Sequence, residues 1–330
     1  MSKLRQLALG NVPIILLVVV FVIFSLLDPR FFDLQTLGNI ARSTAYIGIV
    51  AVGMTLVLMT AGIDLSVGSM LYLVAVVVGQ IINTAAIPVF VVPLLAIGVG
   101  LVLGAVNGFA ISFLRVIPFI VTLAMLTVFR GIGLGLSDSR EVNYPDVIGA
   151  LGSQPILGIP LPVWVFAIVV LIAHIVVTRT PFGRQLLATG EDRAAAERAG
   201  IPVRRILFTV YVIAGGLTGL ASFVAMTQLR TAAPGFGSGD EFDAIAAAVL
   251  GGTSLFGGRG SVFPGTVVGA LLIQLIQTGL QFLQVDLYVT PMIQAGIILL
   301  AVFVDALRTG RLEKLTRRVV MSERTEELTP

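Results

Sequence analysis

The sequence contains no cysteine, one histidine and two lysines, and each scarcity excludes a class of site. Without cysteine there is no disulfide, no thiolate metal site and no cysteine nucleophile. His174 alone cannot supply the paired histidines of a helical zinc site. Lys3 and Lys314 are each followed by leucine, so the Gly-Lys-Ser/Thr sequence of a phosphate-binding P-loop does not occur. We therefore expect no cofactor or metal on this chain, and no binding of ATP through a P-loop.

Charged residues are also scarce. They make up 12% of the 330 residues, whereas 57% are apolar, and the mean hydropathy is +1.03. Soluble domains carry roughly 25% charged residues, so we expect a lipid bilayer, not water, to surround most of this chain. The net charge is only +3, and no run of Lys or Arg lies beside aromatic residues. This pattern argues against nucleic acid as a partner.

Apolar runs long enough to cross a bilayer recur along the whole chain. About 20 apolar helical residues cover the roughly 30 Å of hydrocarbon, and residues 65–114 include no Asp, Glu, Lys or Arg. That stretch is long enough for two crossings, with a turn near Asn83, Pro88 and Pro93. The pattern predicts an all-α, polytopic membrane protein. Its ten predicted crossings cover about residues 12–27, 44–60, 66–82, 89–113, 117–137, 163–178, 206–228, 241–257, 262–283 and 287–304.

The distribution of positive charge predicts the orientation of these crossings. Loops rich in Lys and Arg remain in the cytoplasm, and with a cytoplasmic N-terminus sixteen of the 21 Lys and Arg fall on that side. We therefore expect a single transmembrane domain over residues 1–330 with both termini cytoplasmic, including a tail at 305–330. A slip at the weak segment 241–257 would invert everything after it. The loop 138–162 is expected outside, and the charged loop 179–205 inside.

The loop 179–205 predicts a short helix outside the membrane. Asp192 can cap this helix, the alanine-rich stretch that follows favours helix formation, and Gly200 followed by Pro202 ends it. A helix with alanine on one side and Arg and Glu on the other is too weakly apolar to bind lipid well. Its small face suits a groove on another protein, although a solvated connector is the alternative.

Several polar side chains interrupt the apolar runs and are candidates for lining a transport pathway. Asp64 and Ser66 lie between two runs, where an ionisable group is costly unless it is paired or solvated. They either cap the next helix or line a broken helix, and the two roles are compatible. Asn107 is counted with them. Gln274, Gln277, Gln281 and Gln284 recur at helical spacing, which places four amides on one face, for interhelical hydrogen bonds or for a pathway.

Glycine-rich segments leave two further questions open. Residues 251–261 combine glycines and hydroxyls around Arg259, which suits either an ion- or phosphate-holding loop or a packed turn at the membrane surface. Gly100 and Gly104 are echoed by Gly265 and Gly269, each pair followed by alanine. This echo indicates either an internal repeat, as in many transporters, or close helix packing.

Motifs in a fixed order between about residues 30 and 304 resemble the inner-membrane permease subunits of bacterial ATP-binding-cassette (ABC) importers for monosaccharides, the ribose/xylose/arabinose permease family. They are Gly-Met-Thr-Leu-Val at 53–57, Gly-Ile-Asp-Leu-Ser-Val-Gly-Ser at 62–69, Pro-Phe-Ile-Val-Thr-Leu-Ala-Met-Leu at 118–126, Ala-Thr-Gly at 188–190 with Ala-Ala at 195–196 and Gly-Ile at 200–201, and Asp-Ala-Ile-Ala-Ala-Ala-Val-Leu-Gly-Gly-Thr-Ser at 243–254 with Gly-Arg-Gly-Ser at 258–261.

The resemblance implies a passive permease driven by a separate ATPase. In this family the segment within 179–205 is the coupling helix that docks into the ATPase subunit, which binds ATP and Mg. The residues implied at that contact are Gly190, Asp192, Ala195, Ala196 and Gly200. The resemblance further implies a second permease chain, identical or a close paralogue, an extracytoplasmic sugar-binding protein, and a location in the bacterial inner membrane.

The cargo stays open at this point. Gln277 and Thr278 replace a frequent Asn-Asn of the family, so the cargo can differ from that of its best-known members. Pentoses, hexoses, deoxysugars and sugar-derived signals are all compatible, and the same architecture could carry nucleosides or branched-chain amino acids. The rival hypothesis is a secondary transporter in which Asp64 couples transport to an ion gradient.

Overall fold

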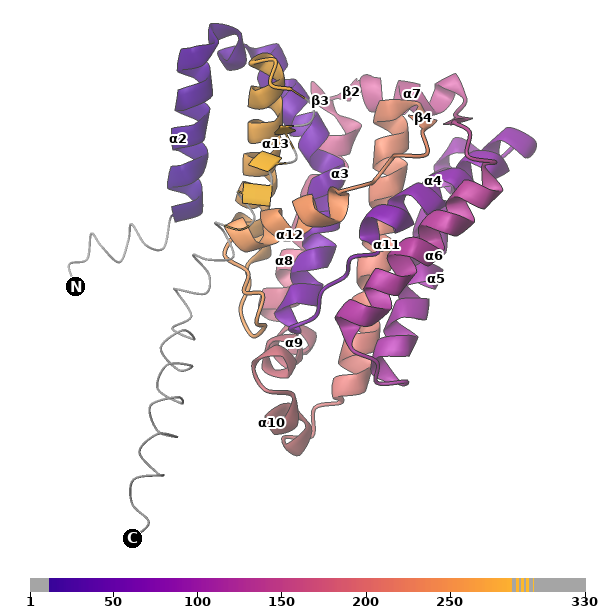
Figure 1. Cartoon of the computed structure of the whole chain (residues 1–330), viewed down its shortest axis with the longest axis vertical. Coiled ribbons are helices and arrows are strands. Elements are labelled where there is room, and N and C mark those ends of the chain that lie inside the picture. The colour runs from indigo at the N-terminus through magenta and orange to yellow at the C-terminus, as the bar shows by residue number, and fades with distance from the viewer. Residues whose placement is uncertain (1–11, 287–288, 291, 294, 297–298, 300–330) are drawn as a thin grey trace, which may run out of the picture.

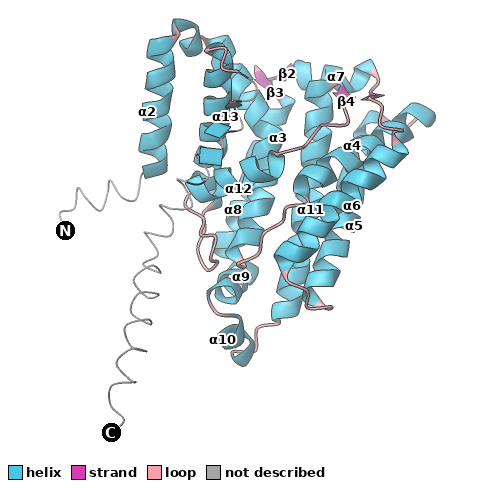
Figure 2. Cartoon of the chain, viewed as in Figure 1, coloured by secondary structure: helices cyan, strands magenta, loops and turns pink. Residues whose placement is uncertain are grey.

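The computed structural model describes residues 12–286, 289–290, 292–293, 295–296 and 299, and helices dominate it (Figure 2). The longer helices are α2 (Val12–Leu27), α3 (Leu34–Met59), α4 (Val67–Thr84), α5 (Val92–Ser112), α6 (Pro118–Leu136), α8 (Leu161–Arg179), α11 (Val203–Leu229) and α13 (Val267–Phe282). The shorter ones are η1 (Pro29–Phe32), η2 (Val89–Val91), α7 (Asp146–Ser153), α9 (Pro181–Glu191), α10 (Arg193–Arg198), α12 (Asp240–Leu250) and η3 (Val262–Thr266).

Four strands of two residues each form two small antiparallel ladders at one end of the molecule (Figures 1 and 2). β1 (Val142–Asn143) pairs with β4 (Thr231–Ala232), and β2 (Pro155–Ile156) pairs with β3 (Ile159–Pro160). Helices α9 and α10 lie at the opposite end (Figure 1). The loops 138–162 and 179–205 are therefore on opposite sides of the helical layer, as the charge pattern predicts.

The prediction of an all-α, polytopic membrane protein is confirmed. Within the described residues, seven helical segments are long and apolar enough to span a membrane, and they correspond to seven of the ten predicted crossings. The predicted crossing 12–27 is the shorter apolar helix α2. The predicted crossing 287–304 lies mostly outside the described residues, and the tail 305–330 lies wholly outside them.

The predicted crossing 241–257 is wrong as a helix. α12 has 11 residues and ends at Leu250, which gives it a length of about 16 Å at 1.5 Å per residue, half the thickness of a bilayer core. The glycines that follow allow the turn, since Gly252 has a φ of +94°. Apolar composition over 241–257 concealed this turn, because alanine and glycine count as apolar in both a helix and a loop.

Glycines allow α5 and α11 to pack at close range. Gly100 and Gly104 of α5 face Gly215 and Gly219 of α11, and a Cβ at Gly104 would collide with the carbonyl of Tyr211. Such small-residue faces are the usual way in which helices associate in lipid, where no hydrophobic force drives them together. The echo has the same structural use, because Gly269 packs against the carbonyl of Ala247 in α12.

Two non-helical connections enter the helical layer, so that the next helix begins inside it (Figure 1). Residues 60–66 run from the end of α3 near α9 to the start of α4. Residues 230–239 run from the opposite end of α11 to the start of α12. The two helix starts meet, because Gly68 lies against the carbonyl of Gly237 and the carboxylate of Glu241. Broken helices of this kind bring helix ends and polar groups together inside a membrane protein.

Substitution of Gly104 tests the close contact of α5 with α11. Gly104→Ala should lower the free energy of unfolding by about 1–3 kcal/mol, because the new methyl group must displace backbone of α11. Thermal unfolding of the purified protein in detergent measures the effect. Gly98→Ala on the same helix is the control, since a Cβ there meets nothing within 4 Å. Equal losses in the two variants would contradict this packing.

Candidate functional site

The connection 60–66 is held by a buried polar group formed by Asp64, Ser66 and Asn107. The Asp64 Oδ1 atom accepts hydrogen bonds from the Ser66 backbone N at 2.9 Å and from the Ser66 Oγ at 2.6 Å. The Asn107 Nδ2 atom of α5 donates to the Ser66 Oγ at 2.8 Å. All three side chains are at most 1% exposed. The structure therefore brings three of the predicted pathway residues together, in a site enclosed by the chain.

This group differs in detail from the predicted helix cap. Ser66 occupies the N-cap position of α4, but its side chain makes no capping hydrogen bond, and Asp64 instead closes a turn onto Ser66. The Asp64 Oδ2, the Asn107 Oδ1 and the Tyr211 hydroxyl are buried without a hydrogen-bond partner among the described residues. Unpaired buried polar atoms are costly, so this connection is a place where a change of conformation could gain new hydrogen bonds.

A second polar group lies at the start of α12. Asp240, Glu241 and Asp243 occupy its first turn, and Glu241 and Asp243 are 6% and 8% exposed. Gly239 precedes the helix with a φ of +94°, which turns the chain from the connection 230–239 into α12. The N-terminus of a helix favours negative charge, so the helix itself helps to hold these carboxylates inside the apolar layer.

Arg130 of α6 fixes the connection that leads to this acidic group. Its Nη1 donates hydrogen bonds to the carbonyls of Phe236 at 2.6 Å and Pro234 at 3.2 Å. The guanidinium carbon lies 5.0 Å from the ring centre of Tyr72 in α4, in a cation–π contact. Arg130 thus joins α6, α4 and the connection 230–239, and it brings a positive charge near Glu241.

The predicted glutamine stripe on α13 is present only in part. The Gln277 Nε2 donates to the Asp243 Oδ2 at 2.7 Å, and the Gln274 Nε2 donates to the Thr278 Oγ1 at 3.3 Å. Gln281 is exposed. Gln284 lies beyond the end of α13 with a φ of +53°, so it does not continue the helical face. The pathway candidates therefore form two separate groups, one around Asp64 and one around Asp243.

The single helix predicted within 179–205 is two helices, α9 and α10, which meet at Asp192. The Asp192 Oδ1 accepts a hydrogen bond from the Ala195 backbone N at 3.0 Å, so its capping role is confirmed. Gly200, with a φ of +79°, follows the end of α10, in agreement with its predicted stop. Asp192, Ala195 and Gly200 are exposed at this end of the molecule.

Gly190 and Ala196 face the chain itself and not a free surface. Ala196 is 4% exposed, and a Cβ at Gly190 would collide with the carbonyl of Met59 at the end of α3. Of the residues that the resemblance implies at a partner contact, the structure leaves Asp192, Ala195 and Gly200 accessible. The two buried members instead seat this segment on the transmembrane helices, which spacing alone could not distinguish from partner contact.

The glycine-rich loop 251–261 is a packed turn against α3 and α9. The Gly258 backbone N donates to the carbonyl of Met59 at 3.0 Å, and Gly257 lies against the carbonyl of Gly190. Gly257 and Gly258 both have a positive φ, of +81° and +72°, which allows this close approach. The structure thus favours the packed-turn interpretation of this loop over an ion-holding one.

Arg130 and the acidic group of α12 were not singled out by sequence reasoning. A signal was available, because Arg130 is a charge within a predicted crossing, and Asp240, Glu241 and Asp243 precede an apolar run directly after glycine. Charges in such positions usually have a functional or structural reason. What the sequence did not supply is that two distant connections bring them to one depth of the molecule.

These features define an all-α, polytopic membrane protein with broken helices and a short helical segment outside the helical layer. The sequence profile of a family described as the branched-chain amino acid transport system / permease component matches residues 36–302. The chain therefore belongs to this family of permeases. No solved structure matches it.

Similar curated proteins are sugar permeases. The chain is 41% identical over 297 residues to the ribose import permease protein RbsC of Escherichia coli (strain K12), which covers 88% of this chain and 92% of that protein. It is 37% identical over 296 residues to RbsC of Haemophilus influenzae, with 88% and 91% covered. It is 35% identical over 296 residues to the D-allose transport system permease protein AlsC of Escherichia coli (strain K12), with 88% and 90% covered.

Removal of the Gln277 amide tests the contact between α13 and α12. Gln277→Leu should lower the free energy of unfolding by about 1–3 kcal/mol, because it leaves the buried Asp243 carboxylate without its donor. Thermal or denaturant unfolding in detergent measures the loss. Gln281→Leu, on the same helix but exposed, is the control and should have little effect. A Gln277→Leu variant as stable as this control would contradict the assignment.

Proposed function

We propose that this chain is the transmembrane subunit of an ATP-driven importer that moves a monosaccharide into the cell. Membership of the permease family and similarity to the ribose and allose permeases support this function. The chain would form the translocation pathway, while ATP and Mg would bind to a separate ATPase subunit. A second permease chain and an extracytoplasmic sugar-binding protein complete the proposed importer, and both termini of the permease would be cytoplasmic in the bacterial inner membrane.

One observation carries the proposal, namely that the segment outside the helical layer contacts both broken-helix units. The Arg193 Nη2 of α10 donates to the carbonyl of Thr60 at 3.1 Å, directly at the start of the connection to α4. Gly190 of α9 lies against Met59 and Gly258, the latter in the loop that follows α12. A displacement of α9 and α10 would therefore reach the connection 60–66 and α12 through packed backbone.

This arrangement supports a simple coupling mechanism. The ATPase would dock on the exposed side of α9 and α10, through Asp192, Ala195 and Gly200. ATP binding would move this segment and favour one of two conformations of the permease, because the ATPase would bind that conformation more tightly. The movement would pass to α4 and α12, whose starting points meet inside the layer at Gly68 and Gly237.

The pathway residues follow from the same geometry. Gln281 is accessible in this chain, whereas Asp64, Ser66, Asn107, Gln274 and Gln277 are engaged in hydrogen bonds within it. We propose that these engaged residues hold the broken helices in register and become available to the pathway as the helices shift. Amides and hydroxyls are suitable partners for the hydroxyl groups of a sugar.

The cargo is proposed to be a monosaccharide, and the family description gives one competing class. Branched-chain amino acids appear in that description, whereas the similar curated proteins carry ribose or D-allose in their names. Binding assays on the partner solute-binding protein, with ribose, allose and leucine as ligands, would separate the two. Tight binding of leucine without any sugar binding would exclude the sugar assignment.

Reconstitution of the permease into liposomes tests the energy source. Uptake should require the ATPase subunit and ATP and should persist when ion gradients are collapsed. The rival, an ion-coupled secondary transporter using Asp64, predicts uptake by the permease alone and its loss when the gradient is removed. Accumulation against a concentration gradient without the ATPase would reject the proposal.

A bulky residue at Ala195 tests the docking surface. Ala195→Trp should weaken association with the ATPase by at least about tenfold, since a steric conflict costing 1.4 kcal/mol is sufficient. Co-purification or surface plasmon resonance measures association. Because Ala195 is exposed, the melting temperature of the permease alone should not change. Ala86→Trp, exposed near the opposite end of the molecule, is the matched control and should associate normally.

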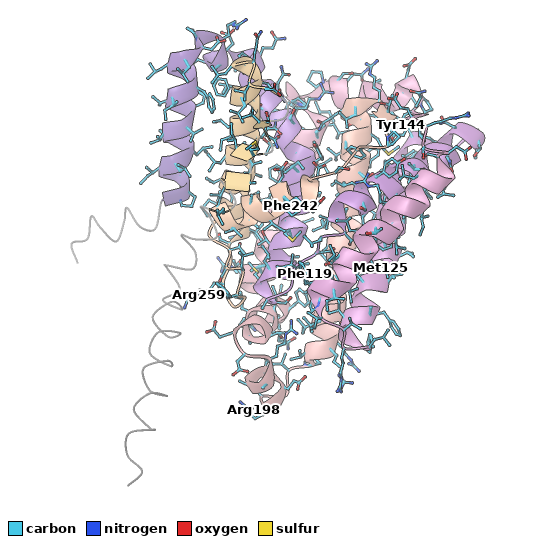
Figure 3. The ribbon with its side chains drawn as sticks, viewed as in Figure 1. Phe119, Met125, Tyr144, Arg198, Phe242 and Arg259 are labelled. Atoms are coloured by element: carbon cyan, nitrogen blue, oxygen red, sulfur yellow. The ribbon has the colours of Figure 1, made fainter. Side chains whose placement is uncertain are left out.

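The Arg193 hydrogen bond gives a separate test of coupling. Arg193→Gln removes the guanidinium that reaches the carbonyl of Thr60, so the assembled importer should hydrolyse ATP but import less solute per ATP. Parallel measurement of phosphate release and solute uptake in proteoliposomes gives this ratio. Arg198→Gln lies on the same short helix at its outer tip (Figure 3) and should keep the normal ratio. An unchanged ratio in Arg193→Gln would remove this contact from the mechanism.

A further inference from the structure

A cavity of about 570 Å³ lies beside α10, at the end of the molecule that the proposed function places in the cytoplasm. The turn between α5 and α6 forms one wall, and α10 with the first turns of α11 forms the other. Its volume is within the usual range of small-ligand sites. It is distinct from the polar groups around Asp64 and Asp243, neither of which lines it.

The side chains that line this cavity give it a positive charge. Arg115, Arg193 and Arg204 contribute three guanidinium groups against one carboxylate, that of Glu197. Arg193 also donates to the carbonyl of Thr60. Arg115 and Arg204 take part in no ion pair within the described part of the chain. Two guanidinium groups on opposite walls are therefore available to an anion, and their planar donors match a phosphate group well.

A buried hydroxyl provides an independent sign of a ligand. Ser112 lines the cavity and is only 2% exposed. Its Oγ atom has no hydrogen-bond partner among the described residues. A serine hydroxyl usually finds a partner when it is buried, commonly the backbone carbonyl one turn earlier in its helix. At the end of α5 this hydroxyl instead remains free, three residues before Arg115.

The rim of the cavity is apolar and accessible. Val116 and Ile117 line the cavity and are themselves 38% and 62% exposed, and the neighbouring Phe113 is 46% exposed. A membrane surrounds these residues, so a ligand with a charged head and an apolar tail would contact both parts of the site. Basic pockets between transmembrane helices on the cytoplasmic side are suited to lipid headgroups in this way.

We propose that this cavity binds a phosphate group, supplied by the headgroup of an anionic phospholipid of the cytoplasmic leaflet. Arg115 and Arg204 hold the phosphate from opposite walls, the Ser112 hydroxyl donates a hydrogen bond to it, and the acyl chains lie along Ile117 and Phe113. The bound lipid would join the α5–α6 turn to the start of α11, next to the segment that contacts the ATPase. Only the choice of leaflet and this last consequence rest on the proposed function.

Native mass spectrometry of the full chain tests the site without any transport assay. The protein is purified from membranes, exposed to equal amounts of phosphatidylglycerol and phosphatidylcholine, and examined for retained lipid. The wild-type protein should retain phosphatidylglycerol preferentially. Arg204→Gln should retain about tenfold less, the effect expected from the loss of one charge-assisted hydrogen bond. Arg205→Gln is the matched control, because Arg205 is adjacent and exposed but does not line the cavity.

Ser112→Ala keeps the test valid if the arginine variants fold poorly. This variant loses no existing hydrogen bond, so it should unfold at the wild-type temperature in phosphatidylcholine nanodiscs and still retain less phosphatidylglycerol. A second arm adds inorganic phosphate to those nanodiscs at constant ionic strength. Stabilisation by phosphatidylglycerol alone identifies the lipid as the source, and stabilisation by inorganic phosphate identifies a free anion in the same site.

Two results would overturn the inference. One is equal retention of both lipids by the wild-type protein together with no response to inorganic phosphate. The other is equal phosphatidylglycerol retention by Arg204→Gln, Ser112→Ala and Arg205→Gln, which would mean that general surface charge holds the lipid. If these arginines weaken only association with the ATPase, the cavity is part of that protein interface and the lipid assignment is wrong. A failed uptake assay with intact lipid retention would count against the proposed function alone.

Discussion

Backbone polar groups inside an apolar layer must find partners within the protein, because lipid offers none. The two non-helical connections of this chain depend on that constraint. Ser66 is held by Asp64 and Asn107, and the carbonyls of Pro234 and Phe236 are held by Arg130. With these partners in place, α4 and α12 can begin inside the layer and meet there. The polar side chains of the core thus make the broken helices possible before they serve any transport step.

Glycine controls how closely the remaining parts approach. Along α5 and α11 it allows two long helices to touch through their backbones, and at Gly190, Gly257 and Gly258 it allows α9 and the loop 251–261 to touch the end of α3. Each contact would be lost to a single side-chain carbon. The segment outside the layer is consequently packed directly onto the units that contain the breaks, an arrangement that suits a protein whose movement is imposed from one side.

The sequence allowed much of this arrangement to be predicted, and its errors have clear causes. Hydropathy located seven spanning segments and the shorter α2, because long apolar helices differ in composition from everything else in the chain. It failed over 241–257, where alanine and glycine are equally apolar in a helix and in a turn. It placed the start of α3 at residue 44 and not at Leu34, because Gln35, Asn39 and Arg42 lower the hydropathy of helical turns without ending them.

The amino-acid sequence by itself determined the solvent of this protein, its all-helical class, the cap at Asp192 and its permease family, since these follow from composition and from residues close together in the chain. The tertiary structure decided which residues meet. Gln277 finds Asp243, Arg130 finds the connection 230–239, and Gly190 faces Met59 and not a partner. Contacts between distant segments depend on how helices pack and where the chain turns back, and a helical spacing of three or four residues carries no information about either.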